Sequence, residues 1–290
     1  MRVLITGASG QVGRALQDAV PPGTELRTLT RAQLDISDAA AVRRTIADFA
    51  PAVVINAAAY TAVDRAESEP AAAEAINAAG PRHLAAAVLG IAGARLLQVS
   101  TDYVFDGRGS APHAPDDSTN PLSVYGRSKL AGEQVVLEVL GNRAVVLRTA
   151  WVYAAAGSNF VLTMLRLMRE RGAVRVVSDQ RGSPTAAASV ARALWRAAEV
   201  PAVHGVLHWT DAGAVSWYEF ARAIAADAQA AGLLTTAPEV TPITTVEYPT
   251  AAPRPLNSVL DLTATAAQLG LQPAPWRANL RATLRALARA

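Results

Sequence analysis

The first half of the chain alternates short apolar runs with longer stretches whose apolar residues recur at helical spacing. The short runs lie at Val3–Thr6, Leu26–Leu29, Val53–Ala57, Leu96–Val99 and Val145–Leu147. The helical stretches between them include Ala39–Phe49, Ala71–Leu89 and Tyr125–Leu140. Apolar strands that alternate with helices are typical of a parallel sheet buried on both faces. We therefore expect an α/β fold, a Rossmann-type doubly wound parallel sheet with its ligand crevice at the carboxyl ends of the strands.

The second half of the chain is less regular. Its pattern predicts helices over Phe160–Arg171, from about Ala186, over Trp217–Ala231 and from about Arg277, and strands over Val174–Ser178 and Val203–Trp209. Proline and glycine interrupt the chain between Pro238 and Pro275, which indicates loops there. We expect a sheet domain over residues 1–150 and a smaller α/β lobe over residues 151–290, with part of about 172–210 returning to the sheet domain. Trp209, Trp217 and Tyr218 are interpreted as core of the smaller lobe.

Composition narrows the class of protein. Of 290 residues, 51% are hydrophobic and 18% charged, which is enough to build a large core. The sequence has no apolar run of the about 20 residues that span a bilayer and no signal-peptide pattern after Met1, so we expect a cytoplasmic protein without a membrane partner. The net charge is only +3 and the cations are scattered, which argues against binding to nucleic acid. Cysteine is absent, which excludes disulfides and thiolate chemistry.

Three glycines follow the first predicted strand. Gly7, Gly10 and Gly13 have the spacing Gly-x-x-Gly-x-x-Gly. Residues without a Cβ let backbone N–H groups approach a pyrophosphate at the N-terminus of a helix. Because the motif occupies the first strand-to-helix turn of an alternating pattern, we interpret it as a phosphate loop, and residues 1–150 as a dinucleotide-binding domain.

The end of the second predicted strand bears on the choice of cofactor. An acid at this point binds the ribose 2′-hydroxyl of NAD, whereas an arginine accommodates the 2′-phosphate of NADP. The chain has Thr30-Arg31 there, without an acid. This favours NADPH and leaves use of NADH open. The alternative is that Arg31 is an ordinary solvated surface residue.

The pair Tyr125 and Lys129 is the strongest catalytic signal. Lys129 is the single lysine among 27 cationic residues, and an i,i+4 spacing places both side chains on one face of a helix. An ammonium beside a phenol lowers the pKa of the phenol and makes it a usable general acid. Ser100 and Thr101 end the fourth strand, where a hydroxyl is placed to hydrogen-bond a reacting carbonyl oxygen, unless the two residues only cap the strand.

These motifs together resemble the extended short-chain dehydrogenase/reductase family, and within it the reductases of dTDP-linked keto sugars. The resemblance extends over nearly the whole chain and includes Asn56–Asp64, Ser100–Gly107, Pro121–Glu133, Arg148–Tyr153, Asn159–Phe160, Asp179–Thr185 and Arg254–Ser258. It implies NADPH-dependent reduction of the C4 keto group of dTDP-4-dehydro-L-rhamnose to dTDP-L-rhamnose. Residues 151–290 are then mainly a substrate-binding lobe.

The resemblance also implies site residues. The catalytic trio is Thr101, which orients the carbonyl, Tyr125, which protonates the developing alkoxide, and Lys129, which tunes Tyr125 and holds the nicotinamide ribose. Thr101, Asp102, Trp151 and Arg254 are expected to contact the substrate. The residues expected to contact the cofactor are Gly7, Gly10, Gln11, Val12, Gly13, Thr30, Arg31, Asp35, Ile36, Ala57, Ala59, Tyr60, Thr61, Ser100, Tyr125 and Lys129.

Other functions stay open. Nucleotide-sugar 4,6-dehydratases of the same family carry an adjacent Asp-Glu after the strand-end threonine, whereas this chain has Asp102-Tyr103. Dehydratases and 4-epimerases also retain NAD, which the missing acid near Thr30 disfavours. A non-catalytic dinucleotide-binding regulatory subunit is a third possibility, although the complete Thr/Tyr/Lys set favours catalysis.

Neither metal binding nor a metal-bridged assembly is expected. Some members of the family have a glutamate two residues after the third loop glycine that helps to form a metal-bridged dimer, but this chain has Ala15 there. His204 and His208 are four residues apart in a strand-like segment without a flanking carboxylate, which does not suit a metal site. We expect a monomer or weak homodimer whose partner is a small dTDP-sugar.

Overall fold

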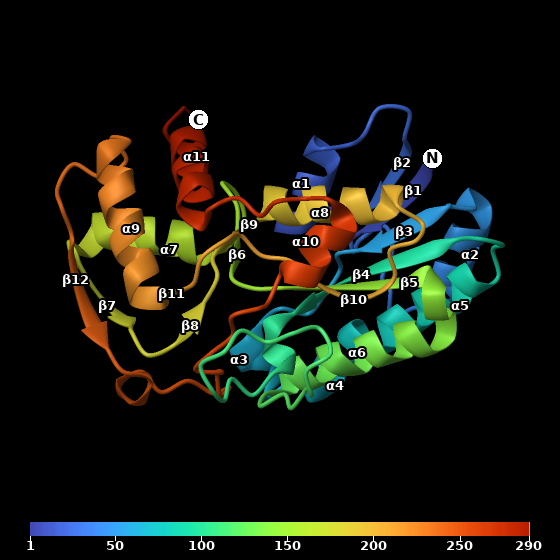
Figure 1. Cartoon of the computed structure of the whole chain (residues 1–290), viewed down its shortest axis with the longest axis horizontal. Helices are drawn as coiled ribbons and strands as arrows, with labels where there is room; N and C mark the ends of the chain where they lie inside the picture. Colours follow the sequence, from blue (N-terminus) through green and yellow to red (C-terminus); the bar gives the residue numbers. More distant parts are fainter. Residues whose placement is uncertain (290) are drawn as a thin grey trace.

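Six apolar segments form one parallel sheet in the computed structural model, which describes residues 1–289 (Figure 1). In the order β10-β5-β4-β3-β1-β2, the strands are Gly205–His208, Ala144–Thr149, Arg95–Thr101, Val53–Asn56, Arg2–Thr6 and Glu25–Leu29. All neighbouring strands run parallel. Every residue of β3 and β5 is buried, which explains why their apolar residues, Val53–Ile55 and Ala144–Leu147, are consecutive rather than alternating.

Helices cover both faces of this sheet. Val3 and Ile5 of β1 point to one hydrophobic core and Leu4 to the other, because successive side chains of a strand alternate between faces. The first face is covered by α1 (Gln11–Asp18), α8 (Ala187–Glu199) and α10 (Thr263–Leu269). The second face is covered by α2 (Ala39–Phe49), α5 (Gly80–Leu89) and α6 (Val124–Leu140). The sheet domain therefore takes segments from both halves of the chain.

A smaller lobe lies beside the sheet domain and has its own core (Figure 1). Its larger elements are α7 (Phe160–Arg171), β7 (Ala173–Val177), α9 (Trp217–Ala230), β12 (Glu239–Ile243) and α11 (Trp276–Arg289). The strands β7 and β12 pair in parallel, and the three helices pack around them. The lobe leaves the sheet at the carboxyl end of β5, where Trp151 follows the strand.

Short elements connect these layers. They are α3 (Val63–Ala66), α4 (Pro70–Glu74), η1 (Ala75–Ala79), η2 (Asp102–Val104), η3 (Gly141–Arg143), β6 (Val152–Tyr153), β8 (Arg181–Gly182), β9 (Thr185–Ala186), β11 (Val215–Ser216) and η4 (Thr245–Glu247). The element η1 is a π-helical turn within the otherwise continuous helix from α4 to α5, and such turns are frequent at functional sites.

The expected fold class is confirmed, and most of the large elements differ from their predicted bounds by one or two residues. The stretch predicted as one helix over Ala71–Leu89 is α4, η1 and α5. Trp209 is fully buried in the core of the sheet domain, so its assignment to the smaller lobe was wrong. The division at residue 150 stays a prediction. None of the helices within residues 1–289 has the length and apolar character needed to cross a membrane.

Candidate active site

The phosphate loop lies where the direction of the strand order reverses. Strand β1 has β2 on one side and β3 on the other, which places the crevice of a doubly wound sheet between the ends of β1 and β3. Gly7 has φ +70° and faces the backbone of Ala57, and a Cβ at Gly7 would lie 2.5 Å from the Ala57 carbonyl carbon. At Gly13 a Cβ would lie 2.2 Å from the Gly7 carbonyl oxygen. The loop therefore needs glycine at both positions, as the sequence predicted.

The N-terminus of α1 opens toward this crevice. Gly10 precedes the helix, and within the described chain no side chain caps the helix start, which leaves its first backbone N–H groups for an anion. The side chain of Gln11 forms hydrogen bonds with the smaller lobe. Its Nε2 donates to the Ser158 carbonyl (3.4 Å), and its Oε1 accepts from Asn159 (2.9 Å). Val12 packs against the sheet core. Gln11 thus holds the loop to the smaller lobe, and Val12 holds it to the core of the sheet domain.

A pocket of about 180 Å³ extends from the loop along the ends of β2 and β3. Its lining includes Gly7, Gly10, Arg31, Asp35, Ile36, Ala57 and Ala59, all of which the sequence predicted as cofactor contacts. The Arg31 side chain is 79% exposed, and its Nε lies 3.7 Å from the Asp35 carboxylate. Hydrogen bonds from Ser37 hold the pKa of Asp35 below its usual value. Thr30 bonds to Gln33 through its hydroxyl (3.0 Å) and supports the turn that carries Arg31.

The segment after β3 is fixed by Asn77, a residue that the sequence did not single out. Asn77 lies in the π-helical turn and exchanges hydrogen bonds with the backbone of Tyr60, at 2.8 and 3.0 Å. Its amide also donates to the Ser128 hydroxyl of α6 (3.0 Å). The Tyr60 side chain is directed away, toward Glu69 (2.7 Å), and Thr61 is exposed. Asn77 thereby ties the cofactor segment to the catalytic helix.

Tyr125 and Thr101 meet at the carboxyl end of β4. Ser123 caps α6 by accepting from the Gly126 N–H (3.1 Å), so Tyr125 lies in the first turn of the helix. Its ring is almost fully buried, and the Thr101 side chain lies close enough to lower the pKa of the Tyr125 hydroxyl. A Cβ at Gly126 would lie 2.2 Å from the Tyr103 carbonyl oxygen, so this glycine permits the helix to approach the end of β4. The structure thus brings the predicted acid and the predicted carbonyl-orienting hydroxyl together.

The ammonium group of Lys129 does not have the partner that the sequence predicted. Its Nζ donates to the Val99 carbonyl (2.6 Å). Burial raises the pKa of Tyr125 to about 12, and the nearby Thr101 side chain opposes this only in part. Burial also lowers the pKa of Lys129 to about 8, against the attraction of Glu133. The expectation that Lys129 depresses the Tyr125 pKa is therefore not met in this arrangement, because the ammonium lies against a backbone carbonyl.

Ser100 also differs from the expectation. Its hydroxyl donates to the Glu133 carboxylate, and the residue is buried, so this hydroxyl does not line the mouth of the cofactor crevice. The strand alternation accounts for the difference, since Ser100 and Thr101 point to opposite faces of β4. Glu133 and its partner Arg148 form a buried ion pair at 2.7 Å, a contact that the sequence did not predict.

Asp102 is the buried carboxyl group of this site. It accepts from the Thr101 hydroxyl (2.9 Å) through Oδ1, and its Oδ2 has no hydrogen-bond partner among residues 1–289. Burial raises the pKa of Asp102 to about 6. An unpartnered buried oxygen beside a catalytic hydroxyl is suited to accept a hydrogen bond from a ligand, which agrees with its expected place near the substrate.

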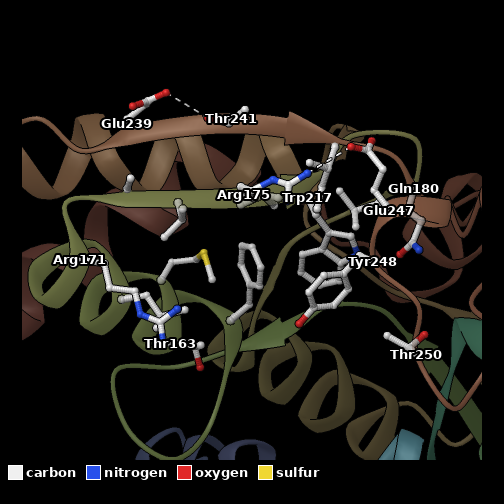
Figure 2. Close-up of a pocket in the computed structure, with 18 of the residues that line it drawn as sticks. Thr163, Arg171, Arg175, Gln180, Trp217, Glu239, Thr241, Glu247, Tyr248 and Thr250 are labelled. Carbon is white, nitrogen blue, oxygen red and sulfur yellow. Dashed lines mark hydrogen bonds and ion pairs between the residues drawn. The ribbon is translucent and has the colours of Figure 1, made fainter.

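A second, larger pocket of about 780 Å³ lies in the smaller lobe between α7 and the strands β7 and β12 (Figure 2). Trp217 and Tyr248 lie at one end of it and Arg171 at the other. Arg175 forms an ion pair with Glu247 at the rim (3.2 Å). Aromatic faces together with arginine side chains suit a ligand that has a flat ring and phosphate groups. Trp217 packs against the core of the smaller lobe, as the sequence predicted, and it also lines the pocket.

Trp151 forms the wall between this pocket and the end of the sheet. Its indole stacks on that of Trp217, with centroids 3.4 Å apart and planes within 7°. Its backbone has φ +48°, a left-handed conformation that is strained for a bulky residue. Gly182 lies against the ring, and a Cβ there would be 2.5 Å from the indole. The wall thus depends on three residues, of which the sequence identified only Trp151 as a site residue.

Arg254 lies where the sheet domain and the smaller lobe meet. It lines the larger pocket and donates to the Asp64 carboxylate through both terminal nitrogens, at 3.0 and 2.7 Å. These hydrogen bonds hold the pKa of Asp64 below its usual value. Arg254 is thus anchored by a residue of α3, one turn beyond the cofactor segment.

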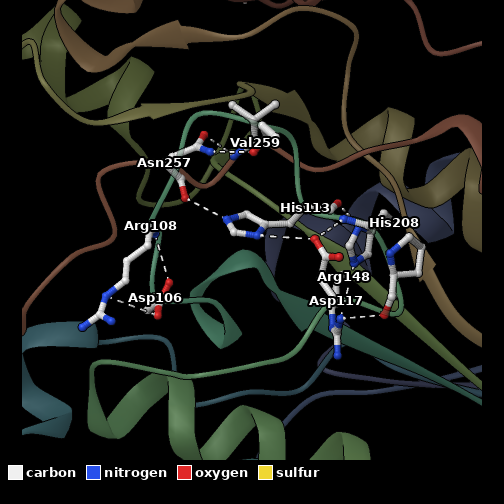
Figure 3. Close-up of polar contacts among 11 residues, drawn as sticks. Asp106, Arg108, His113, Asp117, Arg148, His208, Asn257 and Val259 are labelled. Carbon is white, nitrogen blue, oxygen red and sulfur yellow. Dashed lines mark hydrogen bonds and ion pairs between the residues drawn. The ribbon is translucent and has the colours of Figure 1, made fainter.

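A polar network supports the site from beneath (Figure 3). Arg148 donates to the Pro115 carbonyl (3.2 Å) and contacts the His208 ring (3.4 Å). The carbonyl of His113 lies 3.1 Å from His208 Nδ1. Burial and the neighbouring Arg148 lower the pKa of His208 to about 3, so its ring is neutral. Within residues 1–289, no three His, Cys, Asp or Glu side chains are grouped closely enough to hold a metal ion.

The pocket residues that the sequence missed carried weak signals. Arg175, Glu247 and Tyr248 lie in a region of irregular pattern, and only the structure brings them to one cavity. Glu133 carried a better signal, because it lies four residues after Lys129 on the same helix.

Comparisons with known proteins agree with this geometry. A family model described as the RmlD substrate binding domain matches residues 1–289. The chain is 44% identical to a dTDP-4-dehydrorhamnose reductase of Aggregatibacter actinomycetemcomitans, with 97% of each chain covered. It is 46% identical to that of Streptomyces griseus, over 99% of this chain and 94% of the relative. The solved structure of dTDP-4-dehydrorhamnose reductase from Bacillus anthracis in complex with NADP is similar, with a TM-score of 0.91, 36% identity and coverage of 97% and 98%.

Proposed function

Because this chain belongs to the family of the RmlD substrate binding domain, whose similar relatives are named dTDP-4-dehydrorhamnose reductases, we propose that it reduces the C4 keto group of dTDP-4-dehydro-L-rhamnose to give dTDP-L-rhamnose. One observation carries the proposal: the Tyr125 phenol, in the first turn of α6, lies close to the Thr101 side chain at the carboxyl end of β4. A carbonyl held there has a proton donor and a polarising hydroxyl within reach.

The cofactor is NADPH. Gly7, Gly10 and the open start of α1 fit a pyrophosphate, and Asp35, Ile36 and Ala57 fit the adenosine side of the pocket. Arg31 at the rim fits a 2′-phosphate. When bound, NADPH supplies the hydride. The similar reductase from Bacillus anthracis is a complex with NADP, which supports this assignment.

Each residue of the trio has one task in the reaction. Tyr125 gives its hydroxyl proton to the oxygen that develops negative charge at C4. The Thr101 hydroxyl, which donates to Asp102 Oδ1 in the structure, would turn to donate to the same oxygen and orient the carbonyl. Lys129, whose Nζ donates to the Val99 carbonyl, would hold the nicotinamide ribose through its ammonium group. The high pKa of Tyr125 keeps the phenol protonated at neutral pH, which is the form that the reduction requires.

The larger pocket receives the nucleotide part of the substrate. Trp217 and Tyr248 offer faces for the thymine, and Arg171 and Arg175 offer cations for the diphosphate. Trp151 separates this part from the sugar. Arg254 stays paired with Asp64 and acts at the boundary rather than as a free cation.

The alternatives find less support. A 4,6-dehydratase needs a second carboxylate after Asp102, and Tyr103 occupies that position with its pKa raised by burial. A non-catalytic regulatory subunit would have no use for a proton donor, Tyr125, placed beside the Thr101 hydroxyl. We further propose a monomer or weak homodimer in the cytoplasm, without a metal bridge, since Ala15 packs against the core.

The test is the oxidation of NADPH in the presence of dTDP-4-dehydro-L-rhamnose. The wild-type protein should turn over, and Tyr125→Phe should lower kcat by roughly 10²–10⁴-fold while binding NADPH as before. Tyr218→Phe is the matched control, because Tyr218 lies in α9, outside the trio and the lining of both pockets. Near-normal turnover of Tyr125→Phe would refute the role of Tyr125, and an inactive wild-type protein that binds NADPH would favour the regulatory subunit.

A further inference from the structure

A buried cluster of charged side chains joins Lys129 to Glu133 and Arg148, two residues that have no part in the mechanism above. Lys129, Glu133 and Arg148 are 3%, 1% and 4% exposed. Charged residues are almost never buried to this degree unless they are paired. The cluster holds two cations and one carboxylate, so Glu133 is the group on which the charge balance depends.

The two residues of α6 in this cluster bind consecutive residues of β4. Lys129 Nζ donates to the Val99 carbonyl (2.6 Å), and the Ser100 hydroxyl donates to Glu133. Because Lys129 and Glu133 are four residues apart, they lie one turn apart on the same face of the helix. The next residue of β4 is Thr101. These contacts fix the position of α6 along β4, and with it the position of Tyr125 relative to Thr101.

Arg148 holds Glu133 from the neighbouring strand. Its Nε lies 3.1 and 3.0 Å from the two carboxylate oxygens, and its Nη2 lies 2.7 Å from Oε2. Arg148 is opposite Ser100 in the β4–β5 register, so both partners approach Glu133 from the sheet. The Phe105 ring lies 5.1 Å from the guanidinium carbon. Glu133 is thus held on one side by β4 and on the other by β5.

We infer that Glu133 is a positioning residue of this reductase, which fixes the catalytic helix on β4 and provides the negative charge that keeps Lys129 cationic in a buried site. The inference rests on the proposed role of Lys129. Without Glu133, two buried cations would remain with no carboxylate between them, and the cheaper response is loss of the lysine proton.

The other groups around Lys129 do not supply this charge. On α6 the nearest titratable group is Tyr125, which is neutral because its pKa is raised to about 12. On β5, Arg148 is itself a cation and repels the positive charge of Lys129. On β10, His208 is neutral because its pKa is lowered to about 3. Glu133 raises the pKa of Lys129 against the effect of burial. Glu133 is therefore the attraction that opposes desolvation of the ammonium group.

The single lysine allows a direct test without any substrate. Protein labelled with carbon-13 at the lysine ε-position gives one NMR resonance from the chain, because Lys129 is its only lysine. Titration of that resonance reports the pKa of Lys129, which lies at about 8 in the structure. Glu133→Gln should lower the midpoint by about one pH unit or more. Glu138→Gln, an exposed glutamate of the same helix, should leave it unchanged.

The direction of the shift separates electrostatics from loss of structure. A loosened fold would admit water and move the lysine up toward its ordinary value of about 10.4, whereas removal of an attractive charge moves it down. The activity of Glu133→Gln should fall, and the pH dependence of its kcat should shift to lower pH by the same amount. A midpoint at or above that of wild type would overturn the inference.

A second variant covers the case in which Glu133→Gln does not fold. Glu133→Asp keeps the charge but is too short to contact both Ser100 and Arg148. We expect the lysine midpoint to stay within about half a pH unit of wild type, with kcat reduced several-fold and KM for NADPH unchanged. Wild-type turnover in this variant would overturn the positioning role. Because the titration needs no substrate, an inactive wild-type protein would refute the proposed function without deciding the charge assignment.

Discussion

Asp102 combines complete burial with a carboxyl oxygen that has no hydrogen-bond partner in the described chain. Its pKa is raised to about 6 by burial, from an ordinary value of 3.8. The folded protein therefore binds this proton more tightly than the unfolded chain does. Ionisation of Asp102 costs stability progressively as the pH rises from about 4 to 6, and the full cost, about 3 kcal/mol, is present at higher pH.

Asp102→Asn should remove this cost. Relative to wild type, we expect the variant to gain up to about 3 kcal/mol in the free energy of unfolding above pH 7, and little at pH 4. Urea denaturation of both proteins at pH 4.5 and pH 7.5 measures the difference. A difference that does not change with pH would mean that Asp102 is not the titrating group.

Arg31 is the residue on which the cofactor preference is expected to depend. It lies at the rim of the smaller pocket, and its only ion-pair partner among residues 1–289 is Asp35, at 3.7 Å. A guanidinium–phosphate contact contributes about 1.5–3 kcal/mol, so Arg31→Ala should raise KM for NADPH about 10-fold or more and leave KM for NADH unchanged. Arg44→Ala, on the exposed side of α2, is the control. Equal effects on both cofactors would exclude a 2′-phosphate contact.

Among the elements, those with regular periodicity could be predicted and those defined by partners could not. The bounds of α2 and α7 agree with the prediction because each has a cap at its start, Asp38 and Asn159. Strand β12 carries Pro242 and pairs only with β7, so its sequence resembles a loop. Likewise, the direction of the Ser100 side chain and the contact of Lys129 with Val99 depend on the register between α6 and β4, which no local pattern contains.

The packing of Gly182 in β8 against Trp151, which stacks on Trp217 at the start of α9, is an example of such a partner-defined feature. Gly182→Ala would place a methyl group 2.5 Å from the Trp151 indole, so the ring must move away from its stack on Trp217. We expect KM for the keto sugar to rise several-fold, with little change in NADPH binding, and the near-UV circular dichroism of the tryptophan pair to weaken. Gly90→Ala is the matched control, because its Cβ would make only an ordinary contact at 3.5 Å. An unchanged tryptophan signal in Gly182→Ala would show that the wall does not depend on Gly182.

At the scale of the whole molecule, the two ligand sites lie on different parts of the structure and are joined by few polar contacts. Gln11 and Asn159 connect the phosphate loop to the smaller lobe. Asp64 and Arg254 connect the cofactor segment to the chain that borders the larger pocket. In the proposed reaction, both ligands meet at Tyr125. The rigidity of these connections therefore bears on how well one ligand is placed relative to the other.

The Asp64–Arg254 pair gives a test of this connection. Asp64→Asn removes the charge and one of the two strong acceptors, while it keeps the size of the side chain. Since Asp64 also accepts from the Ala252 N–H (3.1 Å), the segment that carries Arg254 should become less ordered. We expect KM for the keto sugar to rise about five-fold or more, whereas the dissociation constant of NADPH alone should not change, because the phosphate loop and the smaller pocket do not contact Asp64. Glu170→Gln is the control, since it breaks the exposed pair with Arg166, a kind of contact that contributes little. If the substrate KM of Asp64→Asn matches that of the control, the Asp64–Arg254 pair does not position the substrate. The contact between Gln11 and Asn159 would then be the connection that positions one ligand relative to the other.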